Sequence, residues 1–206
     1  MAENNAKLFV IAAPSGAGKT TIVKALVKRN PELCFSISYT TRQKRRTEVH
    51  GVDYLFVDVD EFERLNAEGE LLECAEVFDN FYATSRSQVE KLLSQGQDVV
   101  LEIDWQGARQ VRESMPECVT IFILPPSLEE LERRLRDRRT DSPEVIERRL
   151  RDALSDMSHW DEFDYIIIND KLEQAVADLE RVLAGKGRSC ARSNVALRRV
   201  VSRVIG

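Results

Sequence analysis

The sequence predicts an α/β fold in which a parallel sheet is flanked by helices. Short apolar runs rich in Val, Ile and Leu alternate along the chain with segments whose apolar residues recur at helical spacing. A glycine-containing turn also joins the first apolar run to the first helical segment. Strands that crossover helices bury on both faces have this near-continuous apolar character, so the alternation favours a parallel sheet.

Individual elements can be placed along the chain. Four runs have the length and composition of buried strands: residues 8–11, 98–103, 119–124 and 165–168. Three places have the residues of a helix start: Ser127 with Glu130, Asp58 with Glu61, and Ser142 before Pro143. The helices therefore fall between the apolar runs, as a parallel sheet requires.

Residues 35–85 interrupt this rhythm. The apolar runs become short there and helical spacing is confined to residues 61–67, whereas strand-like patterns cover residues 35–38, 54–57, 71–77 and 81–83. Closely spaced short strands are typical of hairpins. We therefore expect a small, mixed and mostly antiparallel insert in the parallel core.

These patterns divide the chain into four predicted parts. Residues 1–34, 86–126 and 158–185 form the core domain, residues 35–85 the insert, residues 127–157 a lid with its flanking helices, and residues 186–206 a basic amphipathic extension.

Composition excludes several classes of protein. The chain has 206 residues, 43% hydrophobic composition and a net charge of -5, which argues against nucleic acid as its main partner. We find no apolar run near the roughly 18 residues of a membrane span and no signal-peptide layout, so we expect no membrane partner and a cytoplasmic location. Four scattered cysteines and two histidines indicate neither a zinc site nor a disulfide framework.

The glycine-containing turn has the spacing of a phosphate-binding loop. It comprises Ala13, Pro14, Ser15, Gly16, Ala17, Gly18, Lys19 and Thr20. A strand that enters a helix through such a turn directs unpaired backbone N–H groups and the positive helix end at one anion. We expect the loop to bind ATP, with Lys19 on the β- and γ-phosphates and the Thr20 hydroxyl on Mg²⁺.

One feature of the loop leaves an alternative open. Ala13 replaces the first glycine of the pattern, so the backbone there must avoid positive φ. The alternative is an ordinary strand-to-helix turn with a solvated Lys19. We favour the phosphate loop because strand, turn and helix occur in the required order.

A second unusual segment is rich in arginine. Between residues 133 and 151 the chain has arginines at 133, 134, 136, 138, 139, 148, 149 and 151, with acidic residues interspersed. One interpretation is an exposed helix pair laced with ion pairs. The other is a mobile lid that brings arginines to a phosphoryl group, and the nearby phosphate loop favours this second interpretation.

The segment from Ser38 to Tyr54 closely resembles the nucleotide-monophosphate segment of guanylate kinases, S-x-T-T-R-x-P-R-x-G-E-x-x-G-x-D-Y. With the phosphate loop, Glu73, Tyr82, residues 101–107 and the arginine-rich segment, the similarity covers residues 8 to about 184. It implies a P-loop nucleoside-monophosphate-kinase-like fold with a GMP-binding insert and a helical lid. It also implies the reaction ATP + GMP to ADP + GDP, in which Mg²⁺ is the metal and dGMP is a further substrate.

The resemblance assigns roles to individual residues. The residues implied to hold the GMP phosphate are Arg42, Arg45, Tyr54 and Tyr82, and those implied to read guanine are Ser38, Glu73, Thr84 and an acid at Glu102 or Asp104. Lys19, Arg42, Arg138 and Arg149 are the implied catalytic cations, the last two from the lid. The chemistry is consistent, because guanine presents N1–H and N2–H donors that carboxylates accept.

Four positions depart from the family pattern. Lys44 replaces proline, Thr47 replaces glycine, Glu102 replaces aspartate, and Arg139 replaces the glycine of the lid motif R-G-T-D. None removes a cation that would contact phosphate. Asp104 is the more secure of the two candidate acids because Glu102 is longer than the family residue.

Three other functions remain open at this point. The first is a kinase for a different nucleoside monophosphate, and the second is a guanylate-kinase-like module that binds peptides without catalysis. The third is a P-loop GTPase or a nucleic-acid ATPase. The intact loop lysine and the arginines argue against the binding module, since binding alone needs no charge clamp for a transition state.

The end of the chain forms a separate pattern. Residues 186–206 contain six basic residues and no acidic one, and Leu197, Val200, Val201 and Val204 define an apolar stripe at helical spacing. This face can pack on the chain's own core, on a partner subunit, or on nothing stable. Because residues 185–187 resemble a linker, we favour the partner subunit and predict a homo-oligomer.

Overall fold

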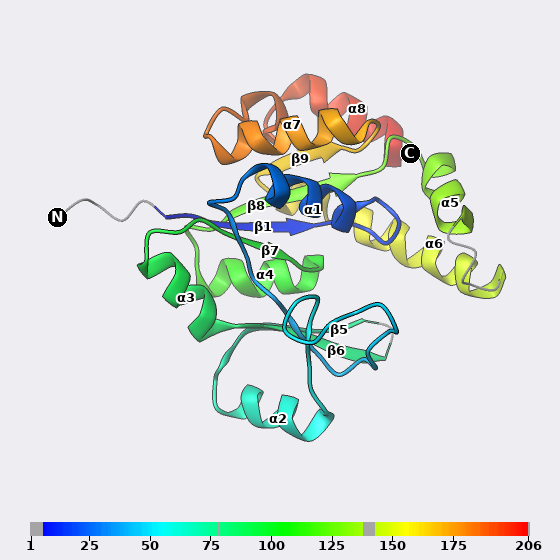
Figure 1. The fold of residues 1–206 in the computed structure, drawn as a ribbon. Helices are drawn as coiled ribbons and strands as arrows, with labels where there is room; N and C mark the ends of the chain where they lie inside the picture. Colours follow the sequence, from blue (N-terminus) through cyan, green and yellow to red (C-terminus); the bar gives the residue numbers. More distant parts are fainter. Residues whose placement is uncertain (1–5, 78, 138–142, 206) are drawn as a thin grey trace. The chain divides into compact units, whose positions relative to one another are not determined.

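The computed structural model describes residues 6–77, 79–137 and 143–205 of the chain (Figure 1). Two compact units are present. The first comprises the N-terminal segment as far as Val10 together with Pro31–Val119, and the second comprises Ile11–Asn30 and Thr120–Gly206.

The larger sheet has five strands and is flanked by helices. Its strands lie in the order β2 (Cys34–Phe35), β7 (Val99–Glu102), β1 (Leu8–Ala12), β8 (Val119–Leu124) and β9 (Tyr165–Ile168). The pairs β2/β7 and β8/β9 are parallel, and all five residues of β1 are buried. The predicted parallel α/β fold and its four strands are therefore confirmed.

The smaller sheet belongs to the first unit. Its order is β4 (Leu55–Phe56), β3 (Tyr39–Thr40), β6 (Asn80–Ser85) and β5 (Leu71–Val77). Strand β3 runs parallel to β4 and antiparallel to β6, and β5 runs antiparallel to β6. The expected mixed, mostly antiparallel insert is confirmed, but the single run predicted at 35–38 is wrong, because Phe35 belongs to the larger sheet and the smaller sheet begins at Tyr39.

Three helices accompany these strands in the first unit: α2 (Val59–Ala67), α3 (Arg86–Ser94) and α4 (Trp105–Ser114). Each begins at a side chain that accepts a backbone N–H: Asp58 from Glu61 at 2.8 Å, Ser85 from Gln88 at 3.3 Å, and Asp104 from Gly107 at 2.7 Å. Phe62 and Leu65 of α2 pack with Leu71 and Ala83 of the sheet. This apolar cluster holds β5 and β6 in place beside α2.

The second unit contains α1 (Lys19–Arg29), α5 (Leu128–Asp137), α6 (Pro143–Met157), α7 (Leu172–Leu183) and α8 (Val195–Ile205), and short 3-10 helices at Trp160–Glu162 and Arg188–Cys190. Helix α5 begins as predicted, since the Ser127 hydroxyl accepts the Glu130 N–H at 3.2 Å. Pro143 opens α6, whereas Ser142 lies outside the described residues. Helices α1 and α7 pack against each other, and Asn30 Nδ2 donates to Glu180 at 3.3 Å across their contact.

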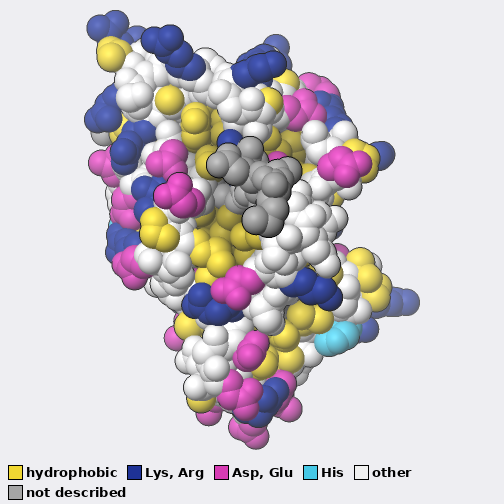
Figure 2. All heavy atoms as spheres, turned by 90° about the vertical axis from the view of Figure 1, so that its left-hand side faces the viewer, with side chains coloured by type: hydrophobic (Ala, Val, Ile, Leu, Met, Phe, Trp, Pro, Cys, Tyr) yellow, Lys and Arg dark blue, Asp and Glu magenta, His cyan; other side chains and the backbone are white. Residues whose placement is uncertain are grey.

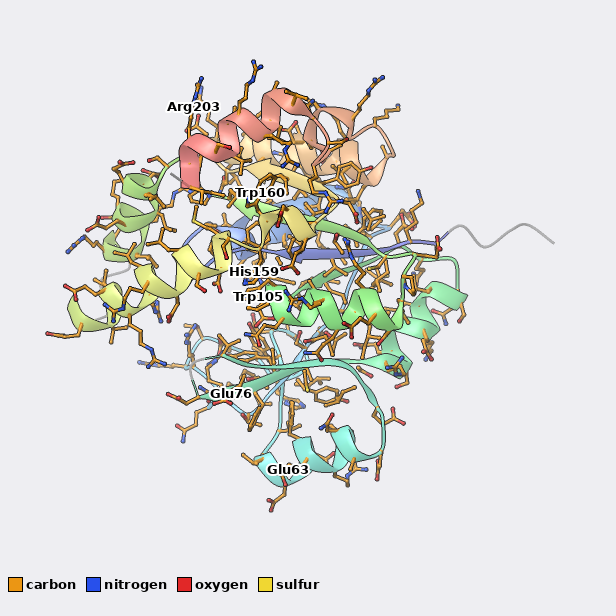
Figure 3. All side chains as sticks on the ribbon, turned by 180° about the vertical axis from the view of Figure 1, so that it is seen from behind. Glu63, Glu76, Trp105, His159, Trp160 and Arg203 are labelled. Atoms are coloured by element: carbon orange, nitrogen blue, oxygen red, sulfur yellow. The ribbon has the colours of Figure 1, made fainter. Side chains whose placement is uncertain are left out.

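The C-terminal segment forms helix α8 and packs partly within its own unit. Val201 and Val204 are 0% and 4% exposed, whereas Val195 and Val200 are 64% and 42% exposed. The guanidinium of Arg198 lies 5.2 Å from the Trp160 ring centroid, and Arg203 points outward (Figure 3). Part of the apolar stripe is therefore covered by the chain itself, and the predicted homo-oligomer stays a prediction.

The described surface carries charges of both signs. Figure 2 shows both basic and acidic side chains on this face, in keeping with 30 Lys and Arg and 35 Asp and Glu residues in the chain. Within residues 6–77, 79–137 and 143–205, none of the helices combines the length and the apolar character that crossing a membrane demands.

The packing of α8 can be tested with two neighbouring valines. Val201→Ala should lower the free energy of unfolding by about 1–3 kcal/mol, because it removes buried methyl groups. Val200→Ala, at a 42% exposed position on the same helix, should change it by less than about 0.5 kcal/mol. Urea unfolding of the three proteins measures both values, and equal losses would contradict this packing.

Candidate active site

The turn after β1 has the geometry of an anion-binding loop. Gly16 and Gly18 have φ of 90° and 92°, values that side chains rarely adopt, and Gly18 caps the helix that starts at Lys19. The first turn of α1 contains no acidic residue, while Lys28 and Arg29 lie in its last turn. The positive end of the helix is therefore directed at the loop without a carboxylate of its own helix to neutralise it.

The alanine at the first position of the loop motif fits this backbone. Among the residues that the structure describes, Asp79 is the one non-glycine residue with positive φ, at 61°. Ala13 therefore takes a conformation open to any residue. Its departure from the glycine pattern introduces no backbone strain.

Side chains of the second unit fix the backbone of the loop through hydrogen bonds. Asn169, buried after β9, donates from Nδ2 to the Ala17 carbonyl at 2.6 Å, and Arg134 of α5 donates to the carbonyls of Asn169 at 2.9 Å and Ala17 at 3.4 Å. A Cβ at Gly18 would lie 2.5 Å from Asn169 Nδ2. The glycine is thus required by both its φ value and its neighbour.

Helix α5 packs against the same loop. A Cβ at Gly16 would lie 2.9 Å from both Leu131 and Leu135, which are buried. Sequence reasoning missed the supporting roles of Asn169 and Arg134. Asn169 could have been found because it is a polar residue directly after a buried strand. Functional groups of parallel sheets lie at the carboxyl ends of the strands.

Most described arginines of the 133–151 segment take part in ion pairs on their own helix. Arg133 contacts Glu130 and Asp137 at 2.7 Å each, and Arg136 contacts Glu132 at 2.5 Å. These pairs match the ion-pair interpretation of the segment. Arg149 lies on α6 with its Nε buried, whereas Arg138 and Arg139 lie outside the described residues.

In the first unit, Arg42 is held in a fixed direction. Its two terminal nitrogens donate to both carboxylate oxygens of Glu48, at 2.7 and 3.1 Å, and one also donates to the Gln43 carbonyl at 2.7 Å. The Arg42 and Glu48 side chains are 15% and 13% exposed. The hydrogen bonds raise the pKa of Arg42 and lower the pKa of Glu48, so both stay charged.

Aromatic residues surround this arginine. The Arg42 guanidinium lies 5.4 Å from the Tyr54 ring centroid and 5.8 Å from that of Phe56, and the Tyr54 and Tyr82 rings are 6.0 Å apart. Burial, followed by the charge of Glu102, raises the pKa of Tyr54 to about 12. The Tyr54 hydroxyl therefore remains a hydrogen-bond donor at neutral pH.

Arg45 and Ser38 differ from these residues in their surroundings. The Arg45 side chain is 71% exposed and its guanidinium reaches Glu48 only at 3.9 Å. Ser38 lies just before β3, where its carbonyl accepts the Leu55 N–H at 2.9 Å. Arg42, Tyr54 and Tyr82 are thus brought together, whereas Arg45 extends into solvent from the same segment.

A buried carboxylate is the most unusual group of the first unit. Glu73 on β5 is 3% exposed, and its Oε1 accepts the hydroxyl of Thr84 on β6 at 2.7 Å. The two residues face each other across the strands. Tyr82 and Thr84 are two residues apart on β6, so their side chains lie on the same face of the sheet. The aromatic cluster and the Glu73 carboxyl group therefore lie on one face.

The two candidate acids near β7 have different environments. Glu102 is the last residue of β7, where its charge acts on Tyr54. Asp104 caps α4, a structural role that the sequence motif did not reveal. No role in the site was assigned to Glu48 or Gly107 from the sequence alone, although both lie within the motifs used there.

The chemistry of each unit follows from these groups. The first unit offers a buried carboxyl group with a fixed cation and two phenol groups, which suit a base with N–H donors and an attached phosphate. The second unit offers a phosphate loop with a lysine. Among the described residues, no group of three or more His, Cys, Asp or Glu side chains is placed to hold a metal ion. The Thr20 hydroxyl on α1 is a hard oxygen donor of the kind that Mg²⁺ accepts beside phosphate oxygens.

Comparisons with known proteins agree with this chemistry. The family model for guanylate kinase matches residues 5–186. A guanylate kinase of Alkalilimnicola ehrlichii is 52% identical over 199 residues, which cover 97% of this chain and 98% of that protein. A guanylate kinase of Pseudomonas fluorescens is 47% identical over 206 residues, which cover 100% of this chain and 100% of that protein.

A solved structure is also similar. The crystal structure of guanylate kinase from Anaplasma phagocytophilum matches with a TM-score of 0.74 and 35% identity, over 98% of this chain and 96% of that one. The family model, the relatives and this structure agree: the chain belongs to the guanylate kinase family, whose reaction is ATP + GMP to ADP + GDP.

Proposed function

We propose that this chain carries out the family reaction with the residues of its two units in distinct roles, GMP on the first and ATP on the second. The observation that carries the proposal is the buried Glu73 carboxylate on the same side of the small sheet as Tyr82 and Thr84. Burying a polar group is costly unless it has partners, so the buried Glu73 carboxyl group favours a binding role.

Guanine recognition follows from hydrogen-bond polarity. The N1–H and N2–H donors of guanine would face the Glu73 carboxylate, while Thr84 keeps one of its oxygens in place. Ser38 and either Glu102 or Asp104 would contribute further contacts to the base. Adenine presents an acceptor at N1 and would offer the Glu73 carboxylate no donor at that position, which is why AMP should be a poor substrate.

The GMP phosphate would lie on Arg42, Arg45, Tyr54 and Tyr82. Glu48 supports this role because it fixes the plane of the Arg42 guanidinium. Tyr54 supports it because its phenol stays protonated and can donate to a phosphate oxygen. Arg45, exposed in its segment, would move onto the phosphate as GMP binds.

ATP would bind on the loop from Ala13 to Thr20. Backbone N–H groups and Lys19 would hold the β- and γ-phosphates, and the Thr20 hydroxyl would be a ligand of Mg²⁺. Bound Mg²⁺ supplies charge neutralisation on the phosphate oxygens. Asn169 and Arg134 support the role of the loop, because they fix the Ala17 carbonyl and keep the backbone preorganised.

The transfer itself needs positive charge more than a protein base. Its loose transition state spreads charge over the phosphoryl oxygens, which Lys19, Arg42, Arg138 and Arg149 would stabilise. Arg138 and Arg149 would also exclude water that could hydrolyse ATP. We place the reaction in the cytoplasm, where the four free cysteine thiols would stay reduced.

Substrate choice tests the guanine assignment. In a coupled assay with ATP, kcat/KM for GMP and dGMP should exceed that for AMP and UMP by at least about 10²-fold, because only guanine matches the buried carboxylate. A preference for AMP would contradict the assignment. Absence of turnover with every monophosphate would instead favour a binding module.

Lysine and arginine substitutions test the catalytic assignment. Lys19→Ala and Arg149→Ala should each lower kcat by on the order of 10³-fold, because each removes charge that stabilises the transition state. Lys28→Ala on α1 and Arg148→Ala on α6, both at exposed positions, are matched controls and should retain activity. Circular dichroism confirms folding, and near-normal turnover of either test variant would refute its role.

A further inference from the structure

Strand β5, which carries Glu73, is an edge strand of the small sheet. Half of the backbone groups on such a strand point away from the neighbouring strand and need other partners. The side chain of Gln110 on α4 supplies them at Cys74: its Nε2 donates to the Cys74 carbonyl at 2.7 Å, and its Oε1 accepts the Cys74 N–H at 3.0 Å. The amide thus pairs with β5 as a further strand would.

The strand is irregular next to Glu73. Leu71 pairs with Ser85 and Glu73 pairs with Thr84, so two steps along β5 correspond to one step along β6. An extra residue of this kind weakens the regular pairing and changes side-chain direction. Glu73 is the first regularly paired residue after this irregularity, and the bonds of Gln110 to Cys74, the next residue, add a second restraint there.

A glycine on the same helix sets the position of the carboxylate itself. Gly107 lies three residues before Gln110, so both face the same side of α4. A Cβ at Gly107 would lie 2.5 Å from Glu73 Oε2, which is closer than such atoms approach. Glycine also lowers helix stability relative to alanine, and room for the carboxylate explains its presence within α4.

The start of α4 is fixed as well. Asp104 accepts the Gly107 N–H at 2.7 Å and sets where the helix begins. The distance along α4 from this cap to Gly107 and Gln110 is then constant. Gly107 and Gln110 therefore lie at fixed distances from the start of α4, and so do their contacts with the Glu73 side chain and the Cys74 backbone.

We propose that Gln110 and Gly107 are positioning residues for base specificity, which hold Glu73 in the register and direction that guanine requires. The inference rests on the proposed role of Glu73 in reading guanine. Gln110 acts through the backbone of Cys74, and Gly107 acts by leaving space for Glu73 Oε2. Neither residue is assigned a contact with the nucleotide.

The N2 amino group of guanine provides a specific probe. Inosine monophosphate (IMP) lacks this donor and keeps the rest of the purine edge that a carboxylate can bind. A correctly aimed Glu73 therefore distinguishes GMP from IMP, and a misdirected one distinguishes them less. A general loss of protein stability would weaken the binding of GMP and of IMP by the same factor.

The experiment compares Gln110→Met and Gly107→Ala with the unmodified chain. The KM for GMP, the inhibition constant of IMP against GMP, kcat and the thermal midpoint are measured for each protein. Both variants should raise the KM for GMP about tenfold, the effect of one lost buried hydrogen bond, while kcat stays within about threefold. The ratio of the IMP inhibition constant to the GMP KM should fall by a similar factor.

Gln106→Met is the matched control, since Gln106 is exposed on the same helix and the substitution is identical. It should leave all four quantities unchanged. If Gln110→Met does not fold, Gln110→Glu replaces it, because the carboxylate still accepts the Cys74 N–H and loses only the donor. That variant should show a smaller loss of discrimination in the same direction.

Two results would overturn the inference, and they differ in meaning. An unchanged ratio in the Gln110 and Gly107 variants, with or without a lowered thermal midpoint, would show that these residues only support the fold. A wild-type ratio near one would show that Glu73 does not read the N2 group. That second result would refute the proposed role of Glu73 as well.

Discussion

The physical constraint on which the first unit depends is the cost of burying the Glu73 carboxylate. A carboxyl group with 3% exposure has lost nearly all contact with water, so partners in the protein must replace that contact. The Thr84 hydroxyl supplies one hydrogen bond, the glycine in α4 leaves space, and the irregular pairing of β5 sets the direction. A base with N–H donors would add hydrogen bonds to this carboxyl group and a base without them would not, which would give selectivity for the ligand.

The second unit would bind an anion with backbone N–H groups and a helix dipole, and not with a buried carboxyl group. Gly16 and Gly18 allow the turn, helix α1 supplies the dipole, and Asn169 and Arg134 fix the Ala17 carbonyl so that the loop needs little reorganisation when phosphate binds. Arg42 illustrates the same principle in the first unit, where Glu48 holds the guanidinium in one plane. In both units the groups that would meet phosphate are oriented in advance by neighbours that would not touch it.

Local patterns predicted most of this architecture. The strand at 71–77, the helix cap at Asp58 and the phosphate loop follow from period, capping chemistry and spacing, all of which act within a few residues. The two-residue strands β2 and β3 are too short for a period, so their division between two sheets was not predicted. The supporting contacts were missed because they join distant positions: Asn169 and Ala17 are 152 residues apart, and Gln110 and Cys74 are 36 apart.

The central claim is that the buried carboxylate selects guanine, and calorimetry of GMP binding tests it most directly. Glu73→Gln keeps the size of the side chain and an oxygen for Thr84, but it presents an N–H₂ donor where guanine also has donors. Glu76→Gln, at an exposed position of the same strand, is the matched control (Figure 3). The account predicts that Glu73→Gln weakens GMP binding by about 10–100-fold and leaves ATP binding and Glu76→Gln unchanged. Equal GMP affinity in Glu73→Gln and the unmodified chain would contradict it.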